Sequence, residues 1–270
     1  MVKVRTDKEL GLMRESGRIT GLALKKVLEN VRLGISGLEL DKIAEDEIKR
    51  LGGRESFKTV DNYKWTTCIT INKQVVHGIP TGLSLKEGDI VSIDLGVLYK
   101  GWHTDAAWSV VVGKSVDQSI RNFLQIGEEA LWSGIAQAVD GNRIGDISEA
   151  IQVCVEGSGY AVVRSLVGHG VGKKLHEDPE VPGYGKKGTG MELKKGMTLA
   201  IEVIYNMGRP DVVLDRDGWT ISSADGSLAG LFEMSVIVGS KKSEVLTPIK
   251  SGLTYNLKSD RIRRFIWMKQ

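Results

Sequence analysis

The sequence has few cysteines and lacks long apolar runs. Its two cysteines, Cys68 and Cys154, lie far apart, and neither belongs to a Cys-x-x-Cys pair suited to zinc binding or redox work. A disulfide framework is therefore excluded, and we expect two reduced, buried thiols. No window approaches the roughly 18 uninterrupted apolar residues of a membrane helix, and residues 1–30 carry charges throughout, without the central apolar stretch of a signal peptide. We expect a cytoplasmic protein without a membrane segment.

The chain has an ordinary globular composition with an uneven charge distribution. It has 270 residues, of which 41% are apolar and 26% charged, and it is long enough to bury a large core. The net charge of +3 hides a basic end, because residues 241–270 hold eight Lys or Arg against Glu244 and Asp260. Such an end is usually a solvated tail, and the alternative is contact with an anionic partner such as RNA.

Helix and strand signals alternate along the chain. Three capping-box patterns precede stretches with helical apolar spacing: Thr6-x-x-Glu9, Ser36-x-x-Glu39 and Ser115-x-x-Gln118. The predicted helices are 7–30, 37–51, 116–139 and 145–157. Between them lie β-rich runs, and the predicted strands are 66–71, 90–98, 104–112, 161–166, 198–205 and 231–238.

Two stretches of the chain echo one another. Gly88-Asp-Ile-Val-Ser-Ile-Asp94 parallels Gly196-Met-Thr-Leu-Ala-Ile-Glu202, and the strands expected to pair with them end similarly, in Ser109-Val-Val-Val-Gly113 and Ser235-Val-Ile-Val-Gly239. This pattern indicates two related halves, each made of two helices followed by a hairpin. Taken alone, the pattern could also be a chance similarity between strand sequences.

Four carboxylates occupy apolar strands within this echo. A hairpin centred on residues 99–100 would place Asp94 directly opposite Asp105, and a longer hairpin would place Glu202 opposite Glu233. Burying such facing acids unpaired costs several kcal/mol, and no Lys or Arg lies beside them in sequence. Two divalent cations would turn the repulsion into coordination. The alternative is that some of these acids face solvent at hairpin edges.

The histidines add a candidate nitrogen ligand. Two of the four, His169 and His176, lie in the glycine-rich stretch 167–176, which lets the backbone approach a ligand closely. One His with four carboxylates makes an oxygen-rich site that favours Mn, Fe or Co, with zinc as the alternative. Two ions about 3.5–4 Å apart activate a shared water and polarise a carbonyl, which is hydrolytic chemistry.

Together these residues resemble the type I methionine aminopeptidases of peptidase family M24, from the first helix to about Pro248. The motifs that carry the resemblance are Cys68-Ile-Thr-Ile-Asn72, Val76-His-Gly-Ile-Pro80, Asp94, Asp105, Gly168-His-Gly-Val-Gly-Lys-Lys-Leu-His-Glu177, residues 196–202, and Asp217-Gly-Trp-Thr220 ahead of Glu233. The resemblance implies an α/β (α+β) pita-bread fold with two pseudo-symmetric halves around a dimetal site. Residues 1–248 would form this single catalytic domain, and residues 249–270 a basic C-terminal extension.

The resemblance also implies a role for each site residue. Asp94 would chelate one metal, His169 and Glu202 would hold the other, and Asp105 and Glu233 would bridge both. Glu202 would also act as general acid/base, His77 would meet the scissile peptide, and His176 would stabilise the tetrahedral intermediate. The methionine pocket maps onto Tyr63, Cys68 and Trp219. The remaining histidine, His103, has no matching role and is interpreted as structural.

The implied activity is removal of the initiator methionine from nascent proteins whose second residue is small, by a monomer that could contact the ribosome through its basic end. Positions near the expected ligands depart from the family pattern and leave metal preference and rate open: Lys173, Leu175, Val203, Leu231 and Met234. One alternative is an Xaa-Pro aminopeptidase or prolidase, which has the same fold but lacks the 76–80 motif. Another is a non-catalytic pita-bread binding protein, although such relatives lose ligands that this chain retains.

Overall fold

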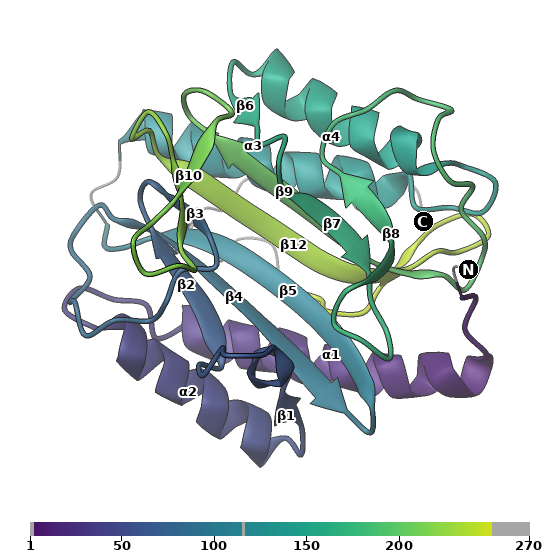
Figure 1. Ribbon diagram of the computed structural model, residues 1–270, viewed down its shortest axis with the longest axis horizontal. Helices are drawn as coiled ribbons and strands as arrows, with labels where there is room; N and C mark the ends of the chain where they lie inside the picture. The colour runs from purple at the N-terminus through teal and green to yellow at the C-terminus, as the bar shows by residue number, and fades with distance from the viewer. Residues whose placement is uncertain (1–2, 115–116, 250–270) are drawn as a thin grey trace.

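The computed structural model describes residues 3–114 and 117–249, which form an antiparallel sheet with four long helices on one face (Figure 1). Helices α1 (Asp7–Leu28) and α2 (Gly37–Arg50) cover the strands of the first half of the chain, and α3 (Gln118–Ala136) and α4 (Ile144–Gly157) cover those of the second. The four helices match the predicted ranges to within a few residues. Within the described ranges, no helix is both long and apolar enough to span a bilayer.

Two of the three predicted capping boxes are present. Thr6 accepts a hydrogen bond from the backbone of Glu9, whose carboxylate accepts the backbone N–H of Thr6 in return. Ser36 and Glu39 repeat this exchange at the start of α2. The third expected cap, Ser115, lies outside the described residues, and the residue that caps α3 is Asp117.

The main sheet joins the two halves of the chain edge to edge. Its central strands are antiparallel, in the order β1-β4-β5-β12-β9-β7-β8, with β2, β6 and β13 attached to β4, β9 and β12. Their bounds are β1 Arg54–Glu55, β2 Thr67–Ile71, β4 Ile90–Tyr99, β5 Trp102–Val111, β6 Ala161–Val162, β7 Val167–Gly170, β8 Glu177–Pro182, β9 Thr198–Asn206, β12 Ala229–Ile237 and β13 Glu244–Val245. The short 3₁₀ helix is Phe57–Thr59, and a second sheet contains β3 (Gln74–Val76), β10 (Val212–Leu214) and β11 (Ile221–Ser223). The predicted strand 161–166 is correct only for its first two residues.

The register of the first hairpin corrects the prediction for Asp94 and Asp105. The β4–β5 turn is formed by Lys100 and Gly101, which both have positive φ, 47° and 82°. This two-residue turn matches the right-handed twist of the strands. It places Asp94 opposite Ala107 and Asp105 opposite Gly96. The two acids are therefore diagonal neighbours and do not face each other directly, but they remain on one face because side chains alternate with a period of two.

In the second hairpin the prediction is confirmed, because Glu202 lies directly opposite Glu233. The two halves do follow the sequence echo, with the hairpins β4–β5 and β9–β12 side by side in the sheet. Aligning the echo at Ser109 and Ser235 makes Ala107 the counterpart of Glu233, and Leu231 the counterpart of Asp105. The inner acids therefore occupy non-equivalent positions, and the expected symmetrical register is wrong for them.

Two serine hydroxyls complete the seam between the halves, which is the contact between strands β5 and β12. Between β5 and β12 the ladder pairs only Glu233 with Ala107 and Met234 with Ala106. Beside these pairs, the Ser235 hydroxyl accepts the N–H of Asp105 at 2.8 Å and donates to its carbonyl at 2.9 Å. The Ser109 hydroxyl does the same for Leu231, at 2.9 and 2.8 Å. The backbone of Asp105 is thus held from the opposite half of the molecule.

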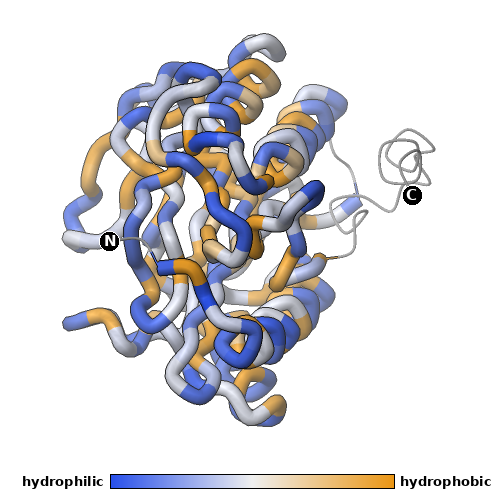
Figure 2. Tube along the Cα trace, turned by 90° about the vertical axis from the view of Figure 1, so that its right-hand side faces the viewer, coloured by the Kyte–Doolittle hydropathy of each residue, from blue (hydrophilic) through white to orange (hydrophobic). Residues whose placement is uncertain are grey.

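The apolar core lies between the sheet and the helices. Residues that alternate with the site acids face it, among them Ile93, Leu95, Trp108 and Phe232, each 0% exposed. The departures Val203 and Met234 belong to this core, so they do not face the acids. Along the helices, hydrophobic and hydrophilic segments alternate as expected for elements buried on one side (Figure 2). The opposite face of the sheet carries the polar site.

Candidate active site

All the side chains that the sequence analysis assigned to the site line one cavity of about 140 Å³. The metal-ligand candidates come from β4, β5, β9, β12 and β7. The other two histidines come from loops, and the pocket residues come from the first half and the β10–β11 loop. The cavity residues are His77, His169, His176, Asp94, Asp105, Glu202, Glu233, Tyr63, Cys68 and Trp219, together with Phe57, Val60, Val76 and Leu175.

The sheet register aligns part of the site in a single row. Cys68 pairs with Asp94, Asp94 with Ala107, Ala107 with Glu233, and Glu233 with Glu202. At the centre of the row Ala107 contributes only a methyl group. Four other side chains of the row lie on either side of this position, those of Cys68, Asp94, Glu233 and Glu202. Asp105, two residues before Ala107 on the same strand face, is the fifth.

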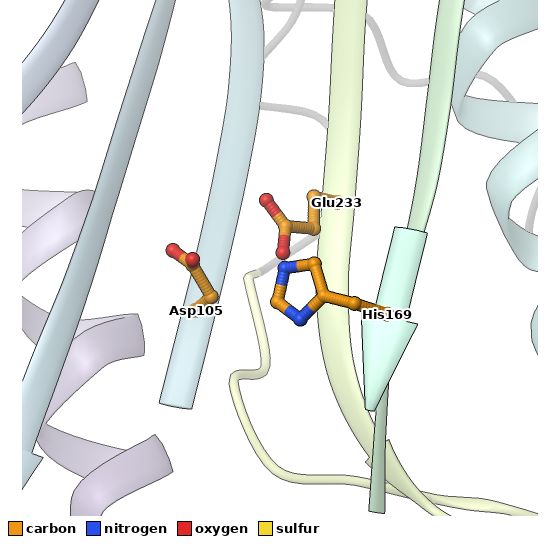
Figure 3. Close-up of side chains that lie close together, drawn as sticks. All are labelled: Asp105, His169 and Glu233. Carbon is orange, nitrogen blue, oxygen red and sulfur yellow. The ribbon is translucent and has the colours of Figure 1, made fainter. Parts of the chain in front are cut away.

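Three side chains converge closely at the centre of the site. Each of Asp105, His169 and Glu233 offers a ligand atom, and these atoms lie within 4.8 Å of one another; Figure 3 shows the three side chains pointing toward one another. The Nε2 atom of His169 is also 3.5 Å from a carboxylate oxygen of Glu202. The Nδ1 atom lies 2.9 Å from the carbonyl of Gly170, so a proton on Nδ1 leaves Nε2 free to coordinate.

The electrostatics of the acids are unfavourable for four ionised carboxylates without a cation. Burial, reinforced by the neighbouring acids, raises the pKa of Asp94, Glu202 and Glu233 well above its ordinary value. Burial also raises the pKa of Asp105 to about 7. Within the described residues, Asp94 Oδ1 and Glu233 Oε1 are buried without a hydrogen-bond partner. Among the residues that the structure describes, no Lys or Arg lines this cavity. Four carboxylates and one imidazole therefore fit two divalent cations.

His77 and His176 stand at the mouth of the cavity. Both also line a second cavity of about 720 Å³, which shares His169 and Glu202 with the first. The rings of His176 and His169 are nearly perpendicular, with centroids 4.4 Å apart. Burial and the neighbouring His176 lower the pKa of His77, which favours a neutral imidazole there. Neutral imidazoles at this place are able to exchange hydrogen bonds with a peptide group.

One side of the cavity is an apolar pocket. The ring of Tyr63 lies 5.0 Å from that of Trp219, and its hydroxyl donates to the Thr67 carbonyl at 2.8 Å. Cys68 is a free thiol, and burial raises its pKa well above the ordinary value, so it remains protonated and apolar. Such a pocket, directly beside Asp94, suits an apolar side chain.

Several structural outcomes bear on the remaining predictions. His103 does not line the cavity; its Nδ1 atom lies 2.6 Å from the Ser56 hydroxyl, in agreement with a structural role. Cys154 is only partly buried, although we expected it to be buried. The sequence motifs did not indicate Phe57, Val60 and Val76 as lining residues, and Leu175 stood out only as a departure beside His176. The identity of an apolar residue gives no local signal that separates a pocket wall from the core.

Comparison with known proteins identifies relatives over nearly the whole chain. Residues 11–238 match the model of metallopeptidase family M24. The chain is 45% identical to methionine aminopeptidase of Clostridium perfringens over 93% of this chain and 100% of that protein. It is 42% identical to methionine aminopeptidase 1 of Bacillus subtilis, over 92% and 100%.

Solved structures agree with these sequence relatives. Methionine aminopeptidase of Thermotoga maritima superposes with a TM-score of 0.89 at 39% identity, covering 92% of this chain and 99% of that one. Prolidase from Pyrococcus furiosus superposes with a TM-score of 0.75 at 22% identity, covering 92% of this chain and 66% of that one. The second similarity shows a shared fold alone.

Proposed function

The chain belongs to metallopeptidase family M24, among the methionine aminopeptidases, which are metal-dependent hydrolases, and on this premise we propose how its residues perform the reaction. The reaction is hydrolysis of the peptide bond after an N-terminal methionine. The observation that carries the assignment is the single cavity that combines four carboxylates, three histidines and an apolar pocket.

We assign the metal ligands as follows. Asp94 would hold one divalent ion, His169 and Glu202 would hold the other, and Asp105 and Glu233 would contribute to both. The buried, unpartnered oxygens of Asp94 and Glu233 support this assignment. The oxygen-rich set favours Mn, Fe or Co, with zinc as the alternative. When bound, the ions supply a Lewis acid for the scissile carbonyl and lower the pKa of a water molecule.

The protein side chains orient the substrate and move the proton. Glu202 accepts a proton from the attacking water and returns it to the leaving amine. His176, at the mouth, donates an N–H to the carbonyl oxygen as negative charge develops there. His77 bonds the peptide group next to the new amine. The methionine side chain occupies the pocket of Tyr63, Cys68 and Trp219.

A peptide assay tests the function. Met-Ala-Ser should be cleaved when Mn²⁺ is added and should resist cleavage after treatment with a chelator, whereas Ala-Pro peptides should remain intact in both conditions. Met-Lys peptides should be poor substrates, since the family likeness implies little space beyond the scissile bond. Cleavage of Ala-Pro in preference to Met-Ala-Ser would favour the prolidase alternative. Absence of any turnover with two metals bound would favour a binding protein.

We also propose that the enzyme acts on nascent chains in the cytoplasm as a monomer with one catalytic domain, residues 1–248. The basic extension 249–270 lies outside the described residues apart from Ile249. Its Lys258, Arg261, Arg263 and Arg264 could bind ribosomal RNA, and phosphate contacts of this kind weaken with salt. Removing residues 254–270 should then abolish co-sedimentation with ribosomes at low salt and leave peptide turnover unchanged.

A further inference from the structure

Arg5 is buried although it precedes the first helix. The residue is 7% exposed, which is rare for arginine unless its charge is paired. Its Nη2 atom forms an ion pair with the carboxylate of Glu177, and its Nε atom lies 3.5 Å from the Thr198 hydroxyl. The guanidinium also stacks over Trp102, 5.2 Å from the ring centroid. A segment at the start of the chain thus reaches the region of the candidate active site.

The partner of Arg5 fastens the loop that carries His176. Loop 171–177 runs from the end of β7, just after His169, to Glu177 at the start of β8. One oxygen of Glu177 accepts the backbone N–H of Lys174 at 3.0 Å, and the other oxygen pairs with Arg5. Burial alone would raise the pKa of Glu177, yet these hydrogen bonds hold it below the ordinary value. The carboxylate is therefore a fixed anion that ties the loop to Arg5.

The other end of the loop is fastened by backbone contacts. Val171 bonds to Thr198 through its N–H, at 3.1 Å, and through its carbonyl, which accepts the Thr198 hydroxyl at 2.6 Å. The Gly172 carbonyl accepts a hydrogen bond from the backbone N–H of His103 at 2.7 Å. A Cβ atom on Gly172 would collide with the Arg5 guanidinium, so glycine is what allows Arg5 to approach this closely. Loop 171–177 is thus held firmly at both ends.

We propose that Arg5 is a positioning residue for the hydrolytic reaction, which acts through Glu177 to hold His176 at the mouth of the cavity. The inference rests on the proposed function of His176. Because His176 immediately precedes Glu177, a movement of this carboxylate carries the imidazole with it. A shift of about 1 Å at a reacting group is enough to cost up to 100-fold in rate.

The geometry requires a guanidinium and not merely a positive charge. Arg5 pairs with Glu177, approaches Thr198 and stacks on Trp102 at the same time. A lysine ammonium is compact and lacks the planar fork, so it can replace the charge but not all three contacts. The Lys173 ammonium lies over the same Trp102 ring, 4.2 Å from its centroid. Loop and N-terminal segment therefore meet on one aromatic surface.

The test compares Arg5→Met and Arg5→Lys with a matched control. Arg14→Met removes another arginine–glutamate pair, Arg14–Glu244, in which both side chains are 47% exposed. Cleavage of Met-Ala-Ser and Mn²⁺ binding by calorimetry are measured for each. Arg5→Met should lower kcat by about 10- to 100-fold and leave KM and metal affinity within about twofold. Arg5→Lys should recover part of the loss, and Arg14→Met should behave as the parent.

Combining Arg5→Met with His176→Ala separates positioning from a general structural effect. If Arg5 acts through His176, the double variant should turn over no more slowly than His176→Ala alone. Losses that multiply, or a kcat of Arg5→Met equal to that of the parent, would overturn the proposal. Full kcat for His176→Ala would instead overturn the proposed role of that histidine. If Arg5→Met does not fold, Arg5→Met with Glu177→Gln removes both charges and takes its place in the same comparison.

Discussion

His77 adopts a backbone conformation that few side chains accept. Its φ is +57°, and it is followed by Gly78, whose carbonyl accepts the N–H of Ile69 at 2.8 Å. A Cβ atom on Gly78 would collide with the carbonyl of Ile69, so this glycine is required for the close pairing with β2. The conformation directs the chain so that the imidazole lines the mouth of the cavity. Left-handed residues at functional sites are often retained for such placement.

Two substitutions at His77 should separate this backbone requirement from the chemistry. Both His77→Asn and His77→Val remove the imidazole, so both should lower kcat/KM on Met-Ala-Ser. Asparagine tolerates positive φ, whereas a β-branched residue there costs about 1–2 kcal/mol. Only the valine variant should lose stability in urea unfolding. Equal stability of the two variants would show that the backbone is not constrained at this position.

The two motif histidines should fail in different ways. His169→Ala should lose metal affinity, with activity partly recovered at high Mn²⁺, because its imidazole lies with Asp105 and Glu233 at the centre of the site. His176→Ala should keep its metals and bind substrate nearly normally, but lose about 10² to 10³ in kcat, the scale for one oxyanion donor. Steady-state kinetics across a metal titration distinguish the two. Rescue of His176→Ala by metal would mean that the roles are exchanged.

At the scale of elements, the seam between β5 and β12 sets the geometry of the site. Glu233 and Asp105 come from strands that belong to different halves, and only a short ladder joins these strands. Ser235 satisfies both backbone groups of Asp105, and Ser109 satisfies both backbone groups of Leu231. The two serines are counterparts in the sequence echo, but only Ser235 holds a proposed ligand.

This asymmetry supplies a matched pair of variants. Ser235→Ala and Ser109→Ala should each lower the free energy of unfolding by about 2–4 kcal/mol, because each leaves a buried N–H and C=O without partners. Only Ser235→Ala should weaken Mn²⁺ binding as well, since it frees the backbone of Asp105. Urea unfolding and calorimetry measure the two effects. An equal loss of metal affinity in both variants would argue against specific support of Asp105.

At the scale of the whole molecule, the proposed metals connect the two halves. The ligands Asp94 and Asp105 come from the first half, and His169, Glu202 and Glu233 come from the second. Without cations, the four buried carboxylates repel one another and their pKa values rise. Metal binding and stability should therefore be coupled across the seam.

Metal removal should accordingly destabilise the fold. Adding Mn²⁺ at 100 times its dissociation constant should increase the free energy of unfolding by about 2.7 kcal/mol for each ion bound, because the ions bind the folded chain. Chelation should reverse this increase. Asp105→Ala and Glu233→Ala should abolish both the metal-dependent increase and the peptidase activity, since each residue contacts both ions in the proposed scheme. Thermal unfolding with and without Mn²⁺ provides the measurement, and unchanged stabilisation in either variant would contradict the ligand assignment.

Local patterns of residue types were sufficient to predict the helices and strands and the chemical character of the site. Capping pairs such as Thr6–Glu9 and apolar spacing predicted the helices, because they depend on residues within a few positions of one another. Acids within apolar strands predicted a cation site, because an unpaired buried charge is costly wherever the strand lies. The family resemblance added the individual roles of these acids, and the cavity brings all the named residues together.

The contacts between distant groups became visible only in the folded chain. The left-handed turn at Lys100–Gly101 placed Asp94 opposite Ala107, a register that strand patterns alone did not resolve because pairings two residues apart keep the same faces. The pair Arg5–Glu177 and the pocket residue Leu175 were likewise decided by contacts between segments far apart in the chain. Such contacts depend on the packing of the whole fold, and no local pattern of residue types encodes them.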